Sequence, residues 1–129
     1  IHDLEAFNLL PVEEQEKVFG RTKSDSTRLS PQPSPSHLSH VELRDGKTGD
    51  DSTPKRNEIS RRSTPYAFHD GTVGLYFMAF CKDQAPLRER MRAMYGMDGQ
   101  ERDRLTSYSN PASGSFYFAP SVETLDKAL

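Results

Sequence analysis

Residues 33–43 read Pro-Ser-Pro-Ser-His-Leu-Ser-His-Val-Glu-Leu, and residues 59–66 read Ile-Ser-Arg-Arg-Ser-Thr-Pro-Tyr. The first run predicts a proline- and serine-rich turn that leads into a short strand over 38–43. The second run predicts a strand over 58–63 that ends before Pro65, because proline cannot continue a central ladder. Residues 44–56, which lie between them, predict an exposed hairpin-type loop.

Helices are predicted on both sides of this stretch. Residues 3–19 contain helical sequence, in which Pro11 suits a first turn and Gly20 a C-terminal stop. Residues 84–95 place apolar side chains at positions i, i+4, i+7 and i+8, which indicates one apolar helix face. A final helical turn or two is predicted over 122–129.

Two aromatic runs predict further strands. Residues 74–80 form an apolar run of the length expected for a buried strand, and residues 114–118 form another aromatic strand closed by Pro120. The predicted order is helix, strand, strand, strand, helix, strand. Strands mixed with packing helices favour an α+β fold.

The composition limits the size of the core. The 129 residues allow one domain, but only 33% are hydrophobic. A chain of this length therefore buries a thin core. Either it carries long solvated loops, or it completes its core against something that this sequence does not contain.

Charge and cysteine content exclude several classes. The net charge of -2 favours neither a nucleic acid nor an anionic membrane as partner. The single cysteine, Cys81, cannot form an internal disulfide and fits a reducing compartment, so a cytoplasmic location is predicted. No apolar run approaches the length of a membrane span.

The histidines are the residues best suited to metal chemistry, and there are four of them: His2, His37, His40 and His69. None has a second ligand at the spacing of a compact zinc site. A single imidazole at one axial position of a cofactor that brings its own remaining ligands fits the sequence better. The alternative interpretation of a histidine in a Ser/Pro loop is an exposed polar residue.

Arg61 and Arg62 are the second feature with a chemical interpretation. They could be a solvated pair at a strand edge, where positive charge opposes aggregation. Alternatively, one of them points inward and stabilises negative charge on oxygen in a pocket with little water. Nucleophilic catalysis has little support, since Cys81 at a strand end is typical of a small core residue.

Together these runs resemble a family. Pro33-x-x-Ser36-His37-Leu38 resembles the proximal haem-ligand motif of the dye-decolourising peroxidases, in their bacterial, B-like branch. Residues 59–66 resemble the segment that carries the distal arginine. Residues 1–23, 74–80 and 113–120 resemble flanking parts of the same C-terminal half.

The resemblance implies a ferredoxin-like α+β fold, with an antiparallel sheet, helices on one face and a haem pocket. Residues 1–129 would be the C-terminal haem-binding domain, with one haem b per parent chain. The resemblance implies His37 as the iron ligand, with His40 as the alternative because Ser39-His40-Val41 repeats the pattern. It also implies that Arg61 lies over the opposite haem face.

The remaining site residues also follow from the resemblance. Ser63 would lie near the distal water network, and Leu75 and Phe77 would line the pocket. The family's Gly-x-x-Asp-Gly aspartate belongs to the N-terminal half and is missing here. This chain alone is therefore expected to be a poor peroxidase.

The implied function is reduction of hydrogen peroxide coupled to oxidation of dyes or other organic donors. The implied partners are these substrates and the missing N-terminal half or another chain, and a homo-oligomer is left open. Two alternatives remain at this point. One is a haem-handling protein without peroxidase turnover, and the other is a non-haem ferredoxin-like interaction module.

Overall fold

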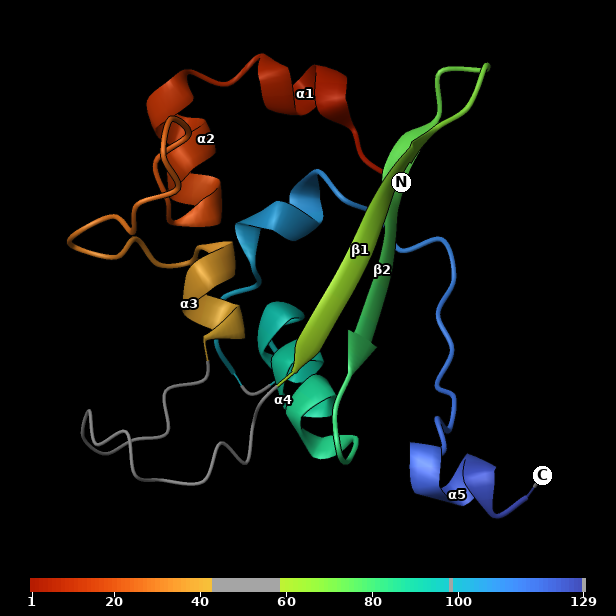
Figure 1. Cartoon of the computed structure of the whole chain (residues 1–129). Coiled ribbons are helices and arrows are strands. Elements are labelled where there is room, and N and C mark those ends of the chain that lie inside the picture. Colours follow the sequence, from red (N-terminus) through yellow and green to blue (C-terminus); the bar gives the residue numbers. More distant parts are fainter. Residues whose placement is uncertain (43–58, 98, 129) are drawn as a thin grey trace.

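The computed structural model describes residues 1–42, 59–97 and 99–128. The helices are α1 (Leu4–Asn8), α2 (Val12–Phe19), α3 (His37–Val41), α4 (Ala85–Met94) and α5 (Val122–Asp126), with a 3-10 helix η1 (Arg104–Ser107). The strands β1 (Ser60–Ala67) and β2 (Val73–Phe80) pair antiparallel (Figure 1). The predicted α+β class is confirmed. The predicted loop over 44–56 lies outside the described residues.

Most of the predicted helices are present. The N-terminal helical sequence forms α1 and α2, which are separated at Pro11, the N-cap of α2. Gly20 ends α2 with a left-handed φ of 83°, a conformation that glycine adopts without a Cβ penalty. The predicted helix over 84–95 is α4, and the last one is α5.

The strand predicted over 38–43 is wrong for the residues that the structure describes, because His37–Val41 form helix α3. The reason is local. The Ser36 side chain accepts a hydrogen bond from the Ser39 backbone, and the Ser39 side chain accepts one from the Ser36 backbone. This capping box outweighs the alternation of apolar residues.

Strand β1 extends further than the strand predicted over 58–63, and it pairs with β2. Instead of ending before Pro65, β1 continues to Ala67, with Pro65 opposite Leu75 on β2. Among the described residues β1 has β2 as its sheet neighbour, so it is an edge strand there. Proline is tolerated on such a strand where its missing N–H would point away from the partner.

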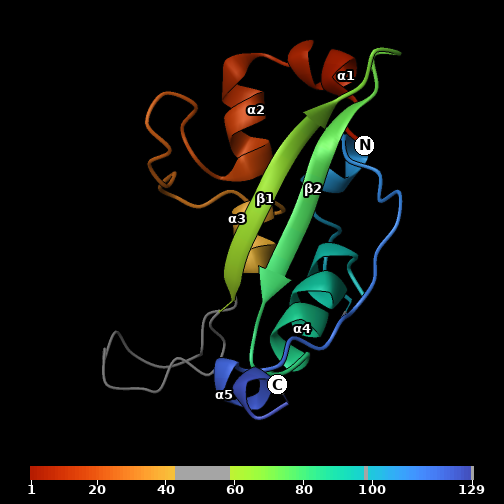
Figure 2. The same ribbon diagram turned by 45° about the vertical axis from the view of Figure 1, so that its right-hand side comes forward.

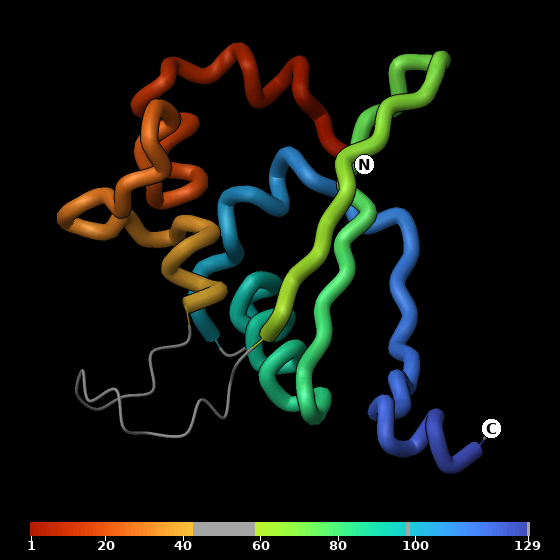
Figure 3. The backbone as a smooth tube through the Cα atoms, in the orientation of Figure 1, coloured from red at the N-terminus to blue at the C-terminus, as the bar shows by residue number. Residues whose placement is uncertain are grey.

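The strand predicted over 114–118 is also wrong, since residues 110–121 have no regular secondary structure and are exposed. They have no neighbour with which to form a ladder among the described residues. The segment is anchored only at its start, where Ser109 bridges to His2 and the Asn110 N–H donates to the Ile1 carbonyl. His2 in turn donates its N–H to the Val73 carbonyl, which holds the N-terminus beside the hairpin (Figure 3).

The core is thin, as the composition predicts. Its buried apolar side chains are Val18, Leu38 and Ala93. Helices α2, α3 and α4 lie on one side of the hairpin (Figure 2), and α3 packs against both other helices. The strand over 74–80 is confirmed, but its expected burial is wrong: most of its large side chains are exposed. None of the helices in the described ranges could cross a membrane.

Gly20 gives the first testable prediction, because it lies against the segment that begins α3. A Cβ at this position would overlap Gln32 Nε2 and come within 2.9 Å of Ser36 Oγ, the cap of α3. We expect Gly20→Ala to destabilise the chain by more than about 1 kcal/mol, because the backbone is left-handed and the space is filled. Thermal unfolding measures this, and Gly71→Ala is the control. Gly71 also has a positive φ but an open surrounding, so it isolates the backbone strain from the overlap.

Candidate functional site

His37 is the first residue of α3, and its position follows from the capping box before it. Its Nδ1 lies 2.7 Å from Oδ2 of Asp103. The Asp103 side chain is fully buried, whereas the His37 side chain is 26% exposed. A buried carboxylate therefore holds one edge of the ring while the other edge stays accessible.

Asp103 is fixed by its own segment. Its backbone N–H donates to the Met94 carbonyl at 3.0 Å, which ties it to the end of α4. Its Oδ1 caps η1 by accepting a hydrogen bond from the Leu105 N–H at 2.9 Å. Both carboxylate oxygens are thus satisfied, as a buried charge requires.

The hydrogen bond to Asp103 determines which nitrogen of the His37 ring carries the proton and which carries the lone pair. A carboxylate accepts, so Nδ1 carries the proton and Nε2 carries the lone pair in the neutral ring. Nε2 has no hydrogen-bond partner among the described residues. This is the arrangement found for metal-ligating histidines, in which an outer carboxylate fixes the ring and raises its basicity.

His40, the alternative ligand, is engaged differently. Its side chain is buried, with Nδ1 2.7 Å from the Ser36 carbonyl and Nε2 2.7 Å from the Glu101 carbonyl. Both nitrogens are therefore occupied by backbone oxygens. This geometry favours His37 over His40 as a ligand.

The other predicted site residues lie together on the hairpin. In the register Ser63 pairs with Phe77, and Arg61 lies two residues before Ser63 while Leu75 lies two before Phe77. Directly paired residues and alternate residues share a face of a sheet. All four side chains are therefore on one face, and Arg62 is on the other. The Arg61 carbonyl accepts a hydrogen bond from Arg62 Nη1 at 3.3 Å, whereas the Arg61 guanidinium has no hydrogen-bond or ion-pair partner among the described residues.

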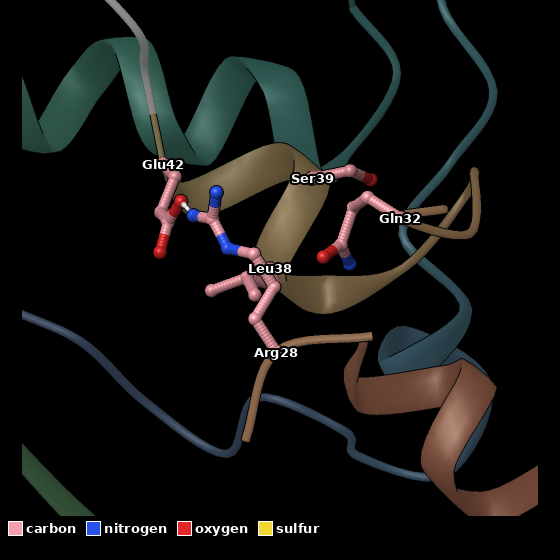
Figure 4. Close-up of a pocket in the computed structure, with 5 residues that line it drawn as sticks. All are labelled: Arg28, Gln32, Leu38, Ser39 and Glu42. Carbon is pink, nitrogen blue, oxygen red and sulfur yellow. Dashed lines mark ion pairs between the residues drawn. The ribbon is translucent and has the colours of Figure 1, made fainter. Parts of the chain in front are cut away.

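A separate pocket of about 400 Å³ lies beside α3 (Figure 4). It is lined by Arg28, Gln32, Leu38, Ser39 and Glu42. None of the predicted site residues is in this lining. Glu42 pairs with Arg28 and lies 3.6 Å from Arg21, so the carboxylate ties the loop after α2 to the end of α3.

Glu14 links α2 to the segment that follows Asp103. It accepts hydrogen bonds from Lys17 at 2.8 Å and from Arg104 at 3.1 Å. These two partners hold the pKa of Glu14 below its usual value. A lowered carboxylate pKa stabilises the folded state above the unfolded pKa and loses that contribution as the pH falls through the folded pKa. The Glu14–Lys17 pair is exposed and the Glu14–Arg104 pair is only partly buried, so this contribution to stability is small.

Asp103 is the residue that the sequence analysis missed. It stands in the polar run Glu101-Arg-Asp-Arg-Leu105, which contains no metal-site spacing. Its one local signal is a helix-cap pattern: Asp103 stands two residues before Leu105 and accepts a hydrogen bond from the Leu105 N–H. The link to His37 spans 66 residues and was not visible in the sequence.

These residues define a class of protein: an α+β domain in which one imidazole, held by a buried carboxylate, is available as a single ligand. In the described part of the chain, no group of three or more His, Cys, Asp or Glu residues could hold a metal ion. The chain belongs to the Dyp-type peroxidase family, because the family model described as "Dyp-type peroxidase, C-terminal" matches residues 1–124. The predicted family and its C-terminal half are confirmed.

Individual relatives point to the same family. The dye-decolorizing peroxidase of Mycobacterium tuberculosis is 32% identical over 128 residues, which cover 98% of this chain and 37% of that protein. A dye-decolorizing protein from V. cholerae aligns with a TM-score of 0.83 at 35% identity, over 98% of this chain and 40% of that one. An arginine-to-leucine variant of Rhodococcus jostii RHA1 DypB in complex with heme aligns with a TM-score of 0.80 at 31% identity, over 97% and 40%.

The chain thus spans about two fifths of the length of these relatives. The neighbours confirm the predicted ferredoxin-like α+β fold.

The His37–Asp103 pair gives a second testable prediction. We expect Asp103→Asn to lower the affinity for haem, and the dye oxidation of the haem-loaded protein, each by about 10–100-fold. The reason is that the His37 ring loses a charged partner that orients it. Haem titration and dye oxidation measure the two effects. Asp83→Asn is the control, because Asp83 is an exposed carboxylate that accepts a hydrogen bond from the Ala85 N–H and has no contact with the His37 ring. Equal behaviour of the two variants would contradict the prediction.

Proposed function

We propose that residues 1–129 are the haem-binding C-terminal domain of a dye-decolourising peroxidase. The parent protein would bind one haem b and reduce hydrogen peroxide while oxidising dyes or other organic donors. One observation carries the proposal: in a chain of this family, a buried carboxylate holds His37 Nδ1 and leaves Nε2 without a partner.

The residues present fit haem. Its porphyrin supplies four iron ligands, so the protein needs to add a single axial nitrogen, and His37 Nε2 is accessible for that purpose. Leu75 and Phe77 are 42% and 55% exposed, and they would cover apolar porphyrin surface. When bound, haem supplies the redox chemistry of peroxide reduction and donor oxidation.

Arg61 and Ser63 are proposed as the polar groups of the opposite wall. A guanidinium donates from a fixed planar fork and stays protonated, so Arg61 would hold negative charge on a peroxide oxygen. For the same reason Arg61 cannot accept and return a proton at neutral pH. The Ser63 hydroxyl can orient water beside it.

A proton carrier is therefore still required. No carboxylate pairs with Arg61 in the described ranges, and the family aspartate that would serve belongs to the other half of the relatives. We propose that the remaining part of the parent protein, or another chain, supplies this group. It would also cover apolar side chains such as Tyr117 and Phe118, which are 90% and 87% exposed.

The test is to load the purified chain with haem and to record its Soret band and its peroxide-dependent dye oxidation. We expect a stable band and oxidation much slower than that of a protein that contains the distal aspartate. A stable band with no peroxide-dependent oxidation in either protein would instead support a haem-handling function. Failure to retain haem would leave a non-haem interaction module.

A further inference from the structure

We propose that His40 is a positioning residue that holds Asp103 against the His37 ring. It does so by connecting α3 to the segment just before η1. The effect of this contact on a haem iron bound to His37 rests on the proposed function. The contact itself is a property of the chain. Nothing in the resemblance assigns His40 a role when His37 is the ligand.

The first observation is the environment of the His40 ring. The side chain is 4% exposed, and each ring nitrogen lies 2.7 Å from a backbone carbonyl, of Ser36 and of Glu101. Carbonyl oxygens only accept, so a ring nitrogen that carries a proton donates to the carbonyl it faces. Ser39 Oγ also lies 3.2 Å from Nδ1, so both edges of the ring contact polar groups.

The second observation is where these two carbonyls lie. Ser36 is the cap of α3 and directly precedes His37, and Glu101 lies two residues before Asp103. The His37–Asp103 and His40–Glu101 contacts therefore join the same helix to the same three-residue segment. Two contacts to α3 restrict the rotation of that segment more than one contact would.

The third observation is the set of other contacts that hold the segment. Gly96 and Gly99 precede it with positive φ values of 66° and 77°, and Glu101 and Arg102 are exposed. Its other contacts among the described residues are the Asp103 N–H bond to Met94, the bonds that Leu105 and Thr106 donate to Asp103, and the Arg102 guanidinium over the Tyr95 ring. From α3, the His37 and His40 side chains are the two that bind this segment.

Helix α3 has contacts that do not involve the His40 ring. Arg90 of α4 donates its Nε–H to the Val41 carbonyl at 2.9 Å, and the two capping-box bonds join Ser36 and Ser39 directly. The ring lies beside this cap, with Nδ1 2.7 Å from the Ser36 carbonyl and 3.2 Å from Ser39 Oγ. We expect His40→Leu, which removes both ring nitrogens at similar volume, to keep the helices while loosening Asp103. His40→Gln retains an amide donor that reaches one carbonyl, and it serves as a second variant if the leucine variant does not fold.

The first measurement uses the isotope-labelled chain without haem. NMR follows solvent exchange of the His37 Nδ1 proton, which the bond to Asp103 protects. We expect His40→Leu to accelerate this exchange about tenfold or more, the factor that corresponds to one hydrogen bond of typical strength. His69→Leu, at an exposed histidine in the β1–β2 turn, should leave it unchanged.

The second measurement uses haem-loaded, reduced protein. Resonance Raman spectroscopy records the iron–histidine stretch, which falls in frequency when Nδ1 loses a carboxylate partner. We expect His40→Leu to lower this frequency in the wild-type background and to have no further effect in Asp103→Asn. A purely structural role of His40 would give the same shift in both backgrounds.

The results separate the inference from the proposed function. Unchanged His37 exchange in His40→Leu, or an equal Raman shift with and without Asp103, would overturn the role of His40. Failure of the chain to bind haem would overturn the proposed function, and the exchange measurement would still decide the role of His40.

Discussion

Replacing His37 with alanine should remove haem from the protein. His37 Nε2 is the ring nitrogen on α3 that is left without a partner, and Asp103 holds the ring in place for a ligand. Loss of an outer partner alone costs about 10–100-fold in metal affinity, so loss of the ligand itself should cost more. The Soret band that remains after purification and desalting measures the loss.

Two controls make this result specific. His69→Ala removes an exposed histidine from the β1–β2 turn and should leave the Soret band unchanged. Free imidazole added to His37→Ala should restore part of the band, because it can occupy the space of the missing ring. Wild-type haem affinity in His37→Ala would rule out His37 as the ligand.

In the parent protein, replacing Arg61 with leucine should abolish most of the proposed peroxidase turnover while haem stays bound. The guanidinium is proposed to stabilise oxygen-centred charge that develops as peroxide is cleaved. Removal of one such preorganised donor costs about 10²–10³ in kcat. Steady-state dye oxidation at saturating peroxide measures the loss, and the Soret band measures haem retention. The loss is expected in kcat more than in the KM for the dye, because Arg61 would act on peroxide.

Arg62 offers a matched control for this variant. It is the neighbouring residue on β1, it is also exposed, and strand alternation places it on the other face of the hairpin. Arg62→Leu makes the same chemical change and should leave kcat within about twofold, since surface changes away from a site have small effects. Equal losses in the two variants would show that the charge of the hairpin, rather than Arg61, matters.

The elements that the sequence predicted well are those coded within a few adjacent residues. Helix α4 follows from apolar positions on one helix face, and β2 follows from an apolar run. The end of α2 at Gly20 follows from the left-handed backbone that glycine adopts there. These signals act over one or two turns, so one stretch of sequence contains them completely.

The wrong predictions concern elements whose state depends on partners. The run over 38–43 has strand-like alternation, but two serine side chains close a helix cap at α3. The aromatic run over 114–118 has strand composition, but a strand forms only by pairing, and the described residues provide no neighbour for it. Composition alone cannot decide between these outcomes.

The sequence by itself determined the family and the motifs that carry His37 and Arg61, because each motif is a run of adjacent residues. Only the tertiary structure decided which histidine keeps an accessible nitrogen. Asp103 engages one ring and the Glu101 carbonyl engages the other, across separations of 66 and 61 residues. Both contacts form because the chain folds so that α3 lies against the end of α4. No local sequence pattern specifies this long-range packing.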